Sequence, residues 1–503
     1  MVKLFETMGK GVSIKWLSGE KTEEIEVESV QCDSRSVRRG DCFVALAGTA
    51  MDGHDYIEEA VRRGASSVIV EKVVSFVPPV ATLLVPDTKK VFGFLCAAIN
   101  GFPSRKLNIV AVTGTNGKSS TAFMIRDFLS ALGSPTGLIG TVRNVLPGRE
   151  TIATHTTPPA MEIQSMLKEI VDAGWKFAVM ETSSHALDQN RLAGCEFRIS
   201  VFTNITQDHL DYHKTMENYF ESKLKLTELI RPDIGSIVYN CDDSILDGEF
   251  SGKHYANIFS FGIVNSANVR ASDVIASFDS TRFILSEDTR VIDKVTIPFS
   301  GVSNVYNFLA AAATLKTLGY GWDGIISNIN KLKAVPGRFE KVYFPSAHVY
   351  VDYAHTPDAL DRLLVWANSI KRKRIITVFG CGGDRDKTKR PIMGKIASEK
   401  SDAVIVTSDN PRTENPDKII GDILEGVAPR DNCIVIRDRR EAIRRALSLL
   451  MEDDILLIAG KGHEDYQIFG KEKIHFDDKE VVKEWVEESL HGGETGSSIY
   501  GNI

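Results

Sequence analysis

A short glycine-containing segment constrains the fold of this chain more than any other part of its sequence. The apolar run from Leu107 to Val112 leads directly into Thr113-Gly-Thr-Asn-Gly-Lys-Ser-Ser120. An apolar run closed by glycines is typical of a buried parallel strand that enters a turn. The residues from Ser119 to Leu132 then have the spacing of a helix. The sequence therefore predicts a strand, a glycine turn and a helix in succession.

The turn has the composition of a phosphate-binding loop. Gly114 and Gly117 allow the backbone to approach an anion closely, and the free N–H groups at a helix N-terminus attract phosphate. Lys118 can reach a terminal phosphate, and the hydroxyl of Ser119 or Ser120 can reach its magnesium ion. The loop is two residues shorter than the common G-x-x-x-x-G-K-[ST] pattern, because its first glycine is Gly114. A glycine turn without a ligand is the alternative.

Length, charge and cysteine usage limit the class of protein. A chain of 503 residues is too long for one hydrophobic core, so about three domains are expected. The formal net charge of -7 gives no general reason to bind nucleic acid, and no apolar run approaches the roughly 18 residues of a membrane span. The seven cysteines form no Cys-x-x-Cys pair, which favours reduced thiols. We expect a cytoplasmic, monomeric protein with small-molecule partners and neither nucleic acid nor membrane.

Strand-like runs alternate with helical segments along most of the chain. In residues 1–105, short strand-like runs surround a helical segment from Tyr56 to Gly64. Residues 106–338 and 339–503 alternate strands with helices, and Pro and Gly near residues 100–104 and 335–338 mark the boundaries. This pattern predicts an α/β fold with three domains: a smaller N-terminal α/β domain, a central P-loop-type domain with a mainly parallel sheet and flanking helices, and a C-terminal Rossmann-like domain.

Polar side chains follow two predicted strands of the central domain, where ligands of parallel sheets bind. Glu181 closes an apolar run, and its carboxylate suits magnesium, although capping of the next helix is the alternative. Four charged or imidazole side chains crowd the segment after the following strand: Asp208, His209, Asp211 and His213. A solvated helix start would explain the aspartates but not both histidines.

The C-terminal domain carries side chains of both charges after its predicted strands. Asp352, Arg385, Asp409, Arg412 and Glu464 all follow apolar runs. Arginine forks onto a carboxylate, and acidic side chains accept from an ammonium, so this mixture suits a zwitterionic ligand. Structural salt bridges are the alternative for each residue taken alone.

Together these motifs resemble those of the Mur ligases, the ATP-dependent, amide-forming enzymes of peptidoglycan precursor synthesis. The resemblance runs over nearly the whole chain and rests on Thr113 to Ser120, Asn204 with Asp208-His209, Ser303 to Asn307, Pro336 to Arg338 and Asp352 to Pro357. Four further segments make the chain similar to the Mur ligases that add the third amino acid: Asp33 to Ala45, Glu181 to His185, Gly380 to Asp384 and Asp409 to Arg412.

The resemblance implies ATP and Mg²⁺ as cofactors and assigns residues to each site. The ATP site would comprise Gly114, Thr115, Asn116, Gly117, Lys118, Ser119, Ser120, Asn304, Asn307, Arg338 and Asp352. Lys118, His209 and Lys223 would be catalytic, and magnesium would be held by Ser119, Glu181, His209 and Lys223, the last as a carbamate. The UDP-linked substrate would contact Cys32, Ser34, His155, Thr156, Thr157, Ser183, Gln189 and Arg191. The incoming amino acid would contact Arg385, Asp409, Asn410, Pro411, Arg412, Gly460 and Glu464.

The implied reaction adds meso-diaminopimelate to UDP-N-acetylmuramoyl-L-alanyl-D-glutamate (UDP-MurNAc-L-Ala-D-Glu) through an acyl phosphate. Residues 1–105 would bind the UDP substrate, 106–338 ATP, and 339–503 the amino acid. Diaminopimelate is implied because, in this family, Asp409-Asn-Pro-Arg412 goes with that amino acid.

Three alternatives stay open. They are the L-lysine-adding ligase, folylpolyglutamate synthase, which lacks the N-terminal UDP-binding domain, and a nucleotide-binding module without catalysis. Lys118, Glu181, His209 and Lys223 together argue against the last.

Overall fold

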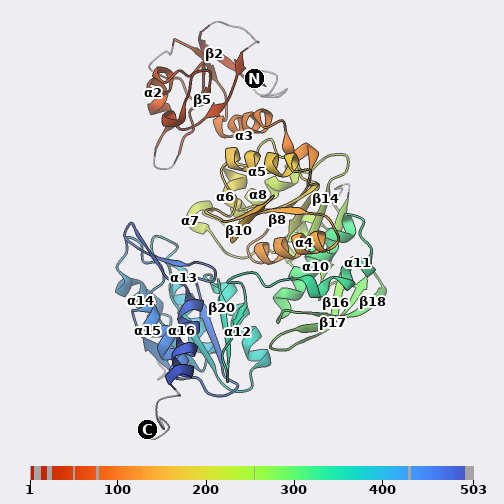
Figure 1. Ribbon diagram of the computed structural model, residues 1–503, viewed down its shortest axis with the longest axis vertical. Helices are drawn as coiled ribbons and strands as arrows, with labels where there is room; N and C mark the ends of the chain where they lie inside the picture. The colour runs from red at the N-terminus through yellow and green to blue at the C-terminus, as the bar shows by residue number, and fades with distance from the viewer. Residues whose placement is uncertain are drawn as a thin grey trace.

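Three sheets follow one another along the chain. The computed structural model describes residues 2–4, 13–19, 25–48, 51–74, 79–253, 255, 257–428 and 432–492. Figure 1 shows the three sheets along the long axis of the molecule, with the first at one end and the last at the other. The mixed α/β fold class predicted from the sequence is confirmed.

The first sheet has five strands in the order β2-β7-β6-β5-β4, in which only β2 is antiparallel to its neighbour. These are β2 (Lys15–Ser18), β4 (Val30–Gln31), β5 (Cys42–Val44), β6 (Ser67–Val70) and β7 (Ala81–Leu84). A separate pair joins β1 (Val2–Lys3) to β3 (Glu26–Val27). The helices are η1 (Ser34–Ser36), η2 (Gly53–Tyr56), α2 (Ile57–Arg62), α3 (Thr88–Ile99) and η3 (Pro103–Lys106). Helix α3 leads to the second sheet and packs against α5 there.

The second sheet has eleven strands in the order β11-β10-β9-β12-β8-β13-β14-β15-β16-β17-β18. It runs parallel from β9 to β16 and antiparallel at both ends. Its strands are β8 (Asn108–Thr113), β9 (Thr136–Ile139), β10 (Arg143–Leu146), β11 (Arg149–Ile152), β12 (Phe177–Glu181), β13 (Ile199–Phe202), β14 (Ser236–Asn240), β15 (Ile258–Gly262), β16 (Val269–Ala276), β17 (Thr281–Glu287) and β18 (Arg290–Ile297).

Helices cover both faces of this sheet, which explains the continuous apolar run of β8. Val110 and Val112 lie in one hydrophobic cluster with residues of α4 and α10, while Ile109 and Ala111 lie in another with residues of α5. The helices are α4 (Lys118–Ala131), α5 (Ala160–Asp172), α6 (Ser184–Asp188), α7 (Leu210–His213), α8 (Met216–Leu224), η4 (Lys225–Leu229), α9 (Ser244–Phe250), α10 (Val302–Thr317), α11 (Trp322–Ser327) and η5 (Ile329–Lys331).

The third sheet has six strands in the order β19-β20-β24-β21-β22-β23, and only the edge strand β19 is antiparallel. They are β19 (Glu340–Val342), β20 (His348–Asp352), β21 (Ile375–Phe379), β22 (Ala403–Val406), β23 (Cys433–Val435) and β24 (Ile455–Ala459). The hairpin β25 (Tyr466–Phe469) and β26 (Glu472–His475) follows. The helices are α12 (Pro357–Ile370), α13 (Lys389–Lys400), α14 (Pro416–Leu424), α15 (Arg439–Ser448) and α16 (Asp478–Gly492).

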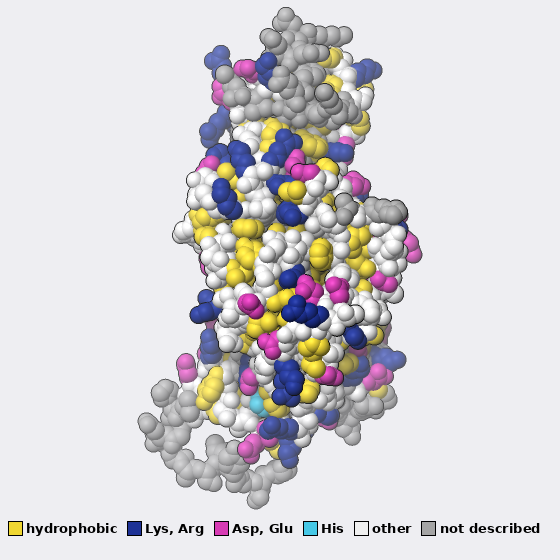
Figure 2. All heavy atoms as spheres, turned by 90° about the vertical axis from the view of Figure 1, so that its right-hand side faces the viewer, with side chains coloured by type: hydrophobic (Ala, Val, Ile, Leu, Met, Phe, Trp, Pro, Cys, Tyr) yellow, Lys and Arg dark blue, Asp and Glu magenta, His cyan; other side chains and the backbone are white. Residues whose placement is uncertain are grey.

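The surface carries charges of both signs. On the face drawn in Figure 2, lysine and arginine side chains are interspersed with aspartate and glutamate. Among the residues that the structure describes, no helix combines the length and the apolar character needed to cross a membrane. All seven cysteines are free thiols.

Candidate active site

The predicted phosphate loop joins β8 to α4, and its backbone requires glycine at two positions. Gly114 and Gly117 have φ values of 141° and 84°. A Cβ atom on Gly114 would lie 2.0 Å from Thr203 Oγ1. Gly117 precedes the first turn of α4, where no described side chain caps the helix. The N–H groups of that turn are therefore available to an anion.

Two lysines converge on the carbonyl oxygen of Gly114. Lys118 Nζ donates to it at 2.9 Å and to Thr115 O at 2.8 Å, and Lys223 Nζ, from α8, donates to it at 3.0 Å. Lys223 is only 1% exposed and lies over the ring of Tyr219. Burial lowers the pKa of both lysines, and the charge of Lys118 lowers the pKa of Lys223 further. Lys223 therefore loses its proton more readily than an exposed lysine does.

Glu181, at the end of β12, lies against the first turn of α4. Its fully buried carboxylate accepts hydrogen bonds from Ser119 Oγ at 2.8 Å, from Thr141 N at 2.9 Å and from Thr141 Oγ1 at 2.8 Å. The next helix, α6, is instead capped by Ser183. A carboxylate beside a hydroxyl at a phosphate loop is a donor set that Mg²⁺ accepts.

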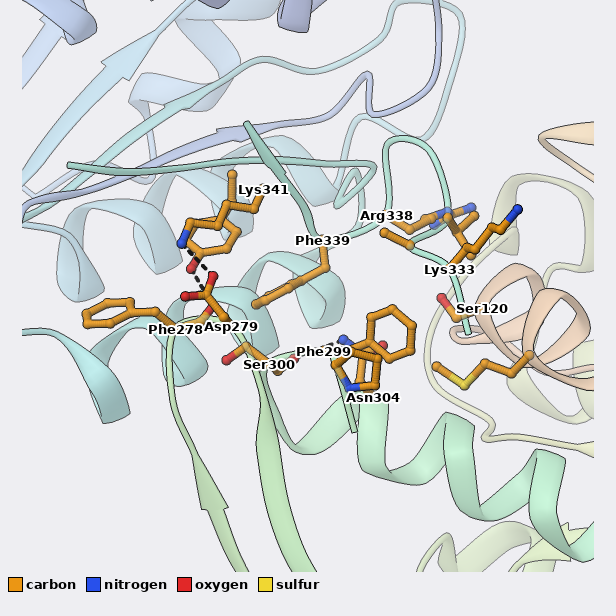
Figure 3. A pocket seen from close by; sticks show the side chains of 15 residues that line it. Ser120, Phe278, Asp279, Phe299, Ser300, Asn304, Lys333, Arg338, Phe339 and Lys341 are labelled. Atoms are coloured by element: carbon orange, nitrogen blue, oxygen red, sulfur yellow. Dashed lines mark hydrogen bonds and ion pairs between the residues drawn. The ribbon is translucent and has the colours of Figure 1, made fainter. Parts of the chain in front are cut away.

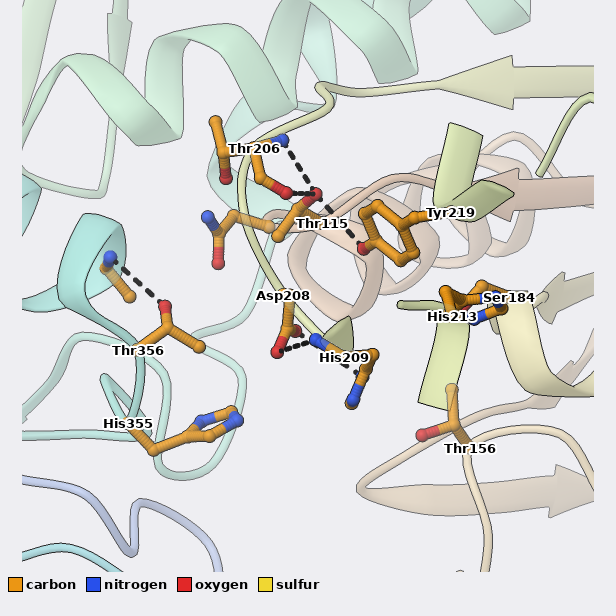
Figure 4. A network of polar contacts seen from close by, with 12 residues as sticks. Thr115, Thr156, Ser184, Thr206, Asp208, His209, His213, Tyr219, His355 and Thr356 are labelled. Carbon is orange, nitrogen blue, oxygen red and sulfur yellow. Dashed lines mark hydrogen bonds and ion pairs between the residues drawn. The ribbon is translucent and has the colours of Figure 1, made fainter. Parts of the chain in front are cut away.

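The segment after β13 brings imidazole groups beside the phosphate loop (Figure 4). His209 has a φ of 54°, and its Nε2 lies 3.4 Å from Asp208 Oδ2. Burial lowers the pKa of His209 although Asp208 opposes the shift, so the ring is neutral at pH 7 and can bind a metal. His213 is buried and bonds Ser184 Oγ at 3.0 Å, which holds α7 against α6. Asp211 is exposed, as expected at a solvated helix start.

A cavity of about 770 Å³ opens between the central and C-terminal sheets. Nine of the predicted ATP residues line it: Thr115, Asn116, Gly117, Lys118, Ser120, Asn304, Asn307, Arg338 and Asp352. His209, Lys223, Thr156 and Ser183 line it as well. Gly114 and Ser119 belong to the same loop and helix, but they are not among the described residues that line the cavity.

The segment that links the two sheets runs beside a smaller cavity of about 130 Å³ (Figure 3). Phe339 N donates to Asp352 Oδ2 at 2.6 Å, and the Arg338 guanidinium lies 4.4 Å from the centre of the Tyr353 ring. Burial raises the pKa of Asp352, while the charge of Arg338 opposes the shift. An ion pair joins Asp279, in the loop between β16 and β17, to Lys341 of β19. The ion pair thus connects the two sheets directly, while the other two contacts hold the linker against the C-terminal sheet.

Six of the eight residues predicted for the UDP-linked substrate lie in the central domain, and four of these are joined to one another by hydrogen bonds. Thr157 Oγ1 donates to Glu181 O at 2.8 Å, and Ser183 N donates to Thr157 Oγ1 at 3.0 Å. Arg191 bonds Thr157 O at 3.0 Å and Gln189 Oε1 at 2.7 Å, and Thr156 accepts from Thr141. His155 is exposed in the same segment.

The other two residues of that set belong to the first sheet. Cys32 is exposed, and Ser34 Oγ donates to Glu59 Oε2 at 2.8 Å. Within the described ranges, no hydrogen bond joins either residue to the six in the central domain. A ligand that touches both groups must therefore span the two sheets.

The residues predicted for the amino acid form a separate group at the carboxyl ends of β21, β22 and β24. Asn410 Nδ2 donates to Glu464 Oε2 at 2.8 Å, and Arg412 Nη1 donates to Gly383 O at 2.7 Å. Four more members follow the same strands: Arg385, Asp409, Pro411 and Gly460. Arg385 is exposed and donates to Asp384 O. None of the seven predicted residues lines the large cavity in the part of the chain that the structure describes.

Three residues of the site are not among those predicted. Thr141 binds Glu181, Asp358 Oδ2 accepts from Asn116 Nδ2 at 2.7 Å, and Lys461 is fully buried beside Asn410. Each follows an apolar run or a predicted motif by one or two residues, which is the only signal the sequence offers. Their roles depend on contacts between distant segments.

Comparisons with known proteins agree with this geometry. Models of three Mur ligase regions match the chain: the Mur ligase family catalytic domain at residues 26–90, the Mur ligase middle domain at 112–315, and the Mur ligase glutamate ligase domain at 337–462.

Two relatives are named UDP-N-acetylmuramoyl-L-alanyl-D-glutamate--2,6-diaminopimelate ligase. That of Clostridium tetani is 41% identical over 472 residues, covering 92% of this chain and 96% of its own length. Ligase 2 of Clostridium acetobutylicum is 43% identical over 466 residues, covering 92% and 95%. A solved structure with the same ligase name has a TM-score of 0.68 at 31% identity, covering 94% of this chain and 98% of its own. This chain therefore belongs to the Mur ligase family.

Proposed function

We propose that this chain is the ATP-dependent ligase that adds meso-diaminopimelate to UDP-MurNAc-L-Ala-D-Glu. The observation that carries the proposal is the convergence of Lys118, Lys223 and His209 with Arg338 and Asp352 on one cavity. The relatives at 41% and 43% identity bear the name of that activity.

The reaction follows from the charges of its groups. The γ-carboxylate of the D-glutamate attacks the γ-phosphorus of ATP, ADP leaves, and an acyl phosphate forms. Both reactants are anions, so the cations of the phosphate loop and the N–H groups of α4 must offset their repulsion. The amine of the amino acid then attacks the acyl carbon, loses a proton, and inorganic phosphate leaves. The new bond is an amide.

The donor set at the loop fits magnesium. Glu181, the Ser119 hydroxyl and the neutral ring of His209 would hold it, together with the carbamate of Lys223. Magnesium, when bound, would neutralise part of the charge of the phosphate groups. The lowered pKa of Lys223 supports its modification, because only a neutral amine adds to CO₂. The carbamate would place an anion beside Lys118.

The three ranges 1–105, 106–338 and 339–503 would serve the UDP substrate, ATP and the amino acid respectively. Cys32 and Ser34 would bind the uridine end of the substrate. The muramoyl dipeptide end would be bound by the hydrogen-bonded group of Thr157, Ser183, Gln189 and Arg191. The group around Asn410, Arg412 and Glu464 would select the amino acid: Arg412 and the Asn410 amide for carboxylates, Glu464 for an ammonium. The protein would act in the cytoplasm as a monomer.

The test is ADP release by the purified protein with ATP and Mg²⁺. Release should require both UDP-MurNAc-L-Ala-D-Glu and meso-diaminopimelate, and the product should gain the mass of one diaminopimelate minus water. Equal or better use of L-lysine would point to the lysine-adding ligase. Release with a folate and glutamate, but not with the UDP substrate, would favour folylpolyglutamate synthase.

A further inference from the structure

Lys461 is a buried lysine that the reaction described above does not use. It follows β24, between Gly460 and Gly462, and its side chain is 0% exposed. Its Nζ lies 3.2 Å from Glu464 Oε2 and donates to Asn410 Oδ1 at 3.3 Å. It therefore contacts two residues that the proposed function assigns to the amino acid. Glu464 would bind its ammonium group, and Asn410 would bind a carboxylate.

The hydrogen bonds around Asn410 fix the direction of its amide. Oδ1 accepts from Lys461 Nζ and from Ile468 N of β25, the latter at 3.0 Å. Nδ2 donates to Glu464 Oε2 at 2.8 Å. An amide nitrogen carries two hydrogens, so one Nδ2 hydrogen is left for a carboxylate.

The charge of Lys461 also bears on the ionisation of Glu464. Burial raises the pKa of Glu464, and the nearby Asp409 raises it further, while Lys461 opposes both effects. The other groups that face Glu464 are the Tyr353 hydroxyl, 3.5 Å from Oε1, the ring of Tyr466 and the more distant Arg439. Lys461 is the cation in hydrogen-bond contact with the carboxylate, so its removal would favour the protonated form at neutral pH.

We propose that Lys461 is a positioning residue for the incoming amino acid, which pairs with the Glu464 carboxylate and fixes the Asn410 amide so that one Nδ2 hydrogen stays available to the ligand. The inference rests on the proposed function, because that function assigns Asn410 and Glu464 to the amino acid. Among the described residues, Lys461 does not line the large cavity. It acts through its two partners.

The first test is the Lys461→Met variant, which keeps most of the side-chain volume and removes the charge. Its KM for meso-diaminopimelate should rise roughly ten- to hundred-fold, the range of a lost charged hydrogen bond. Its KM for ATP and for the UDP substrate should stay near wild type. The KM for the amino acid should fall again as the pH rises, because Glu464 then loses its proton.

Lys473→Met is the matched control. Lys473 lies over the same Tyr466 ring, 3.7 Å from its centre, but it is exposed on β26 and contacts neither Asn410 nor Glu464 through any hydrogen bond of the described residues. This variant should keep the wild-type KM for every substrate. A role of Lys461 in stability alone would lower kcat and the melting temperature and leave the KM for the amino acid, and its pH profile, unchanged. That result would overturn the inference.

A double variant tests the inference even if Lys461→Met alone folds poorly. The double variant Lys461→Met with Glu464→Gln removes both partners and leaves no isolated charge from this pair. If Lys461 acts partly through Glu464, Lys461→Met should raise the KM for the amino acid clearly less in the Glu464→Gln background than in the wild type. An equal rise of the KM in both backgrounds would show no coupling between Lys461 and Glu464 and would refute the inference.

The wild-type assay separates this inference from the proposed function. If the wild-type protein releases no ADP with meso-diaminopimelate, the proposed function is wrong, and the wild-type assay alone shows this. If the wild type is active and Lys461→Met keeps the wild-type KM at every pH, the proposed function stands and Lys461 has no positioning role.

Discussion

The phosphate loop and the amino-acid group both contain buried lysines, but they hold them in opposite ways. Lys118 and Lys223 donate to backbone carbonyls, and neither forms an ion pair with a carboxylate of the described residues. Lys461 pairs with Glu464, and Arg439 nearby forms a fully buried pair with Asp478 at 2.7 Å. The first region leaves its lysines without an ion-pair partner among the described residues, while the second is internally balanced.

The difference matches the charges of the ligands. A nucleotide triphosphate and a carboxylate bring several negative charges, so uncompensated cations stabilise them most in a buried site. Diaminopimelate has two ammonium and two carboxylate groups and no net charge. A balanced site needs only to direct its donors and acceptors. Substitutions in the phosphate loop should therefore lower catalysis. Substitutions in the amino-acid group should lower substrate selectivity or the stability of the fold.

Lys223→Ala tests the phosphate-loop region and should have the largest effect. Loss of the carbamate removes a charged group next to the transferring phosphoryl, so kcat should fall about 10³-fold. Acetate or another short carboxylate should restore part of the activity by occupying the space left by the side chain. The measurement is ADP release with and without added carboxylate.

Lys225→Ala is the control for that experiment. Lys225 lies two residues further on, half-exposed, and pairs with Asp188 at 2.8 Å. Its substitution should change kcat less than about twofold, as is usual for an exposed ion pair. Full activity of Lys223→Ala would remove Lys223 from the mechanism.

Arg412→Ala tests the balanced region. Under the proposed function, Arg412 would supply the cation that distinguishes diaminopimelate, with its extra carboxylate, from L-lysine. The wild type should prefer diaminopimelate, and the variant should lose roughly 100-fold in kcat/KM for it while ATP binding persists. Parallel assays with both amino acids at equal concentration measure the preference.

The matched variant is Arg437→Ala, an exposed arginine that pairs with the exposed Asp417. It should leave the preference as in wild type. Better use of L-lysine by the wild type would be incompatible with a carboxylate-binding role for Arg412.

Glu414→Gln tests whether the balanced charges stabilise the fold. Glu414 accepts from Arg390 at 2.8 Å and from Asp384 N at 2.6 Å, which ties the segment carrying Arg412 to the glycine loop before α13. The Arg390 hydrogen bonds lower the pKa of Glu414 to about 2 from 4.5. A lowered folded-state pKa gives stability that is complete above pH 4.5 and is lost as the pH falls towards 2.

The variant should therefore lose about 2 kcal/mol at pH 7 and progressively less below pH 4.5. Thermal unfolding at pH 7 and at pH 3.5 measures both values. The exposed Glu425→Gln serves as the control and should unfold like wild type at either pH. A deficit of Glu414→Gln that is equal at the two pH values would show that the charge of Glu414 is not the cause.

Domain closure should be the smallest measured change, and it would bring the two regions together. The acyl phosphate must form near His209, yet none of the amino-acid residues lines the described cavity. We expect the C-terminal sheet to move towards the central one about the linker near Gly337. Small-angle scattering should give a smaller radius of gyration with an ATP analogue plus the UDP substrate. An unchanged radius would contradict closure.

The sequence predicts local elements of the site better than contacts between distant segments. The strand, glycine turn and helix around Gly114 are local, and the structure has β8 and α4 within one residue of the expected positions. The burial of Lys223 is not local: in the sequence it resembles its surface neighbour Lys225, and only the approach of α8 to the loop distinguishes them. Thr141 and the contact of Lys461 with Asn410 were missed for the same reason, because Glu181 and Asn410 lie 40 and 51 residues away in the sequence.

The close approach of two glycines has a consequence for recombining ligases of this family. A Cβ atom on Gly337 of the linker would lie 1.9 Å from His463 N, and one on Gly462 would lie 2.4 Å from Gly337 O. The linker and the loop after β24 therefore fit each other at the level of the main chain. A chimera that takes the linker from one parent and this loop from another will join two backbones that were never fitted together. Crossover points are better placed so that both segments come from the same parent.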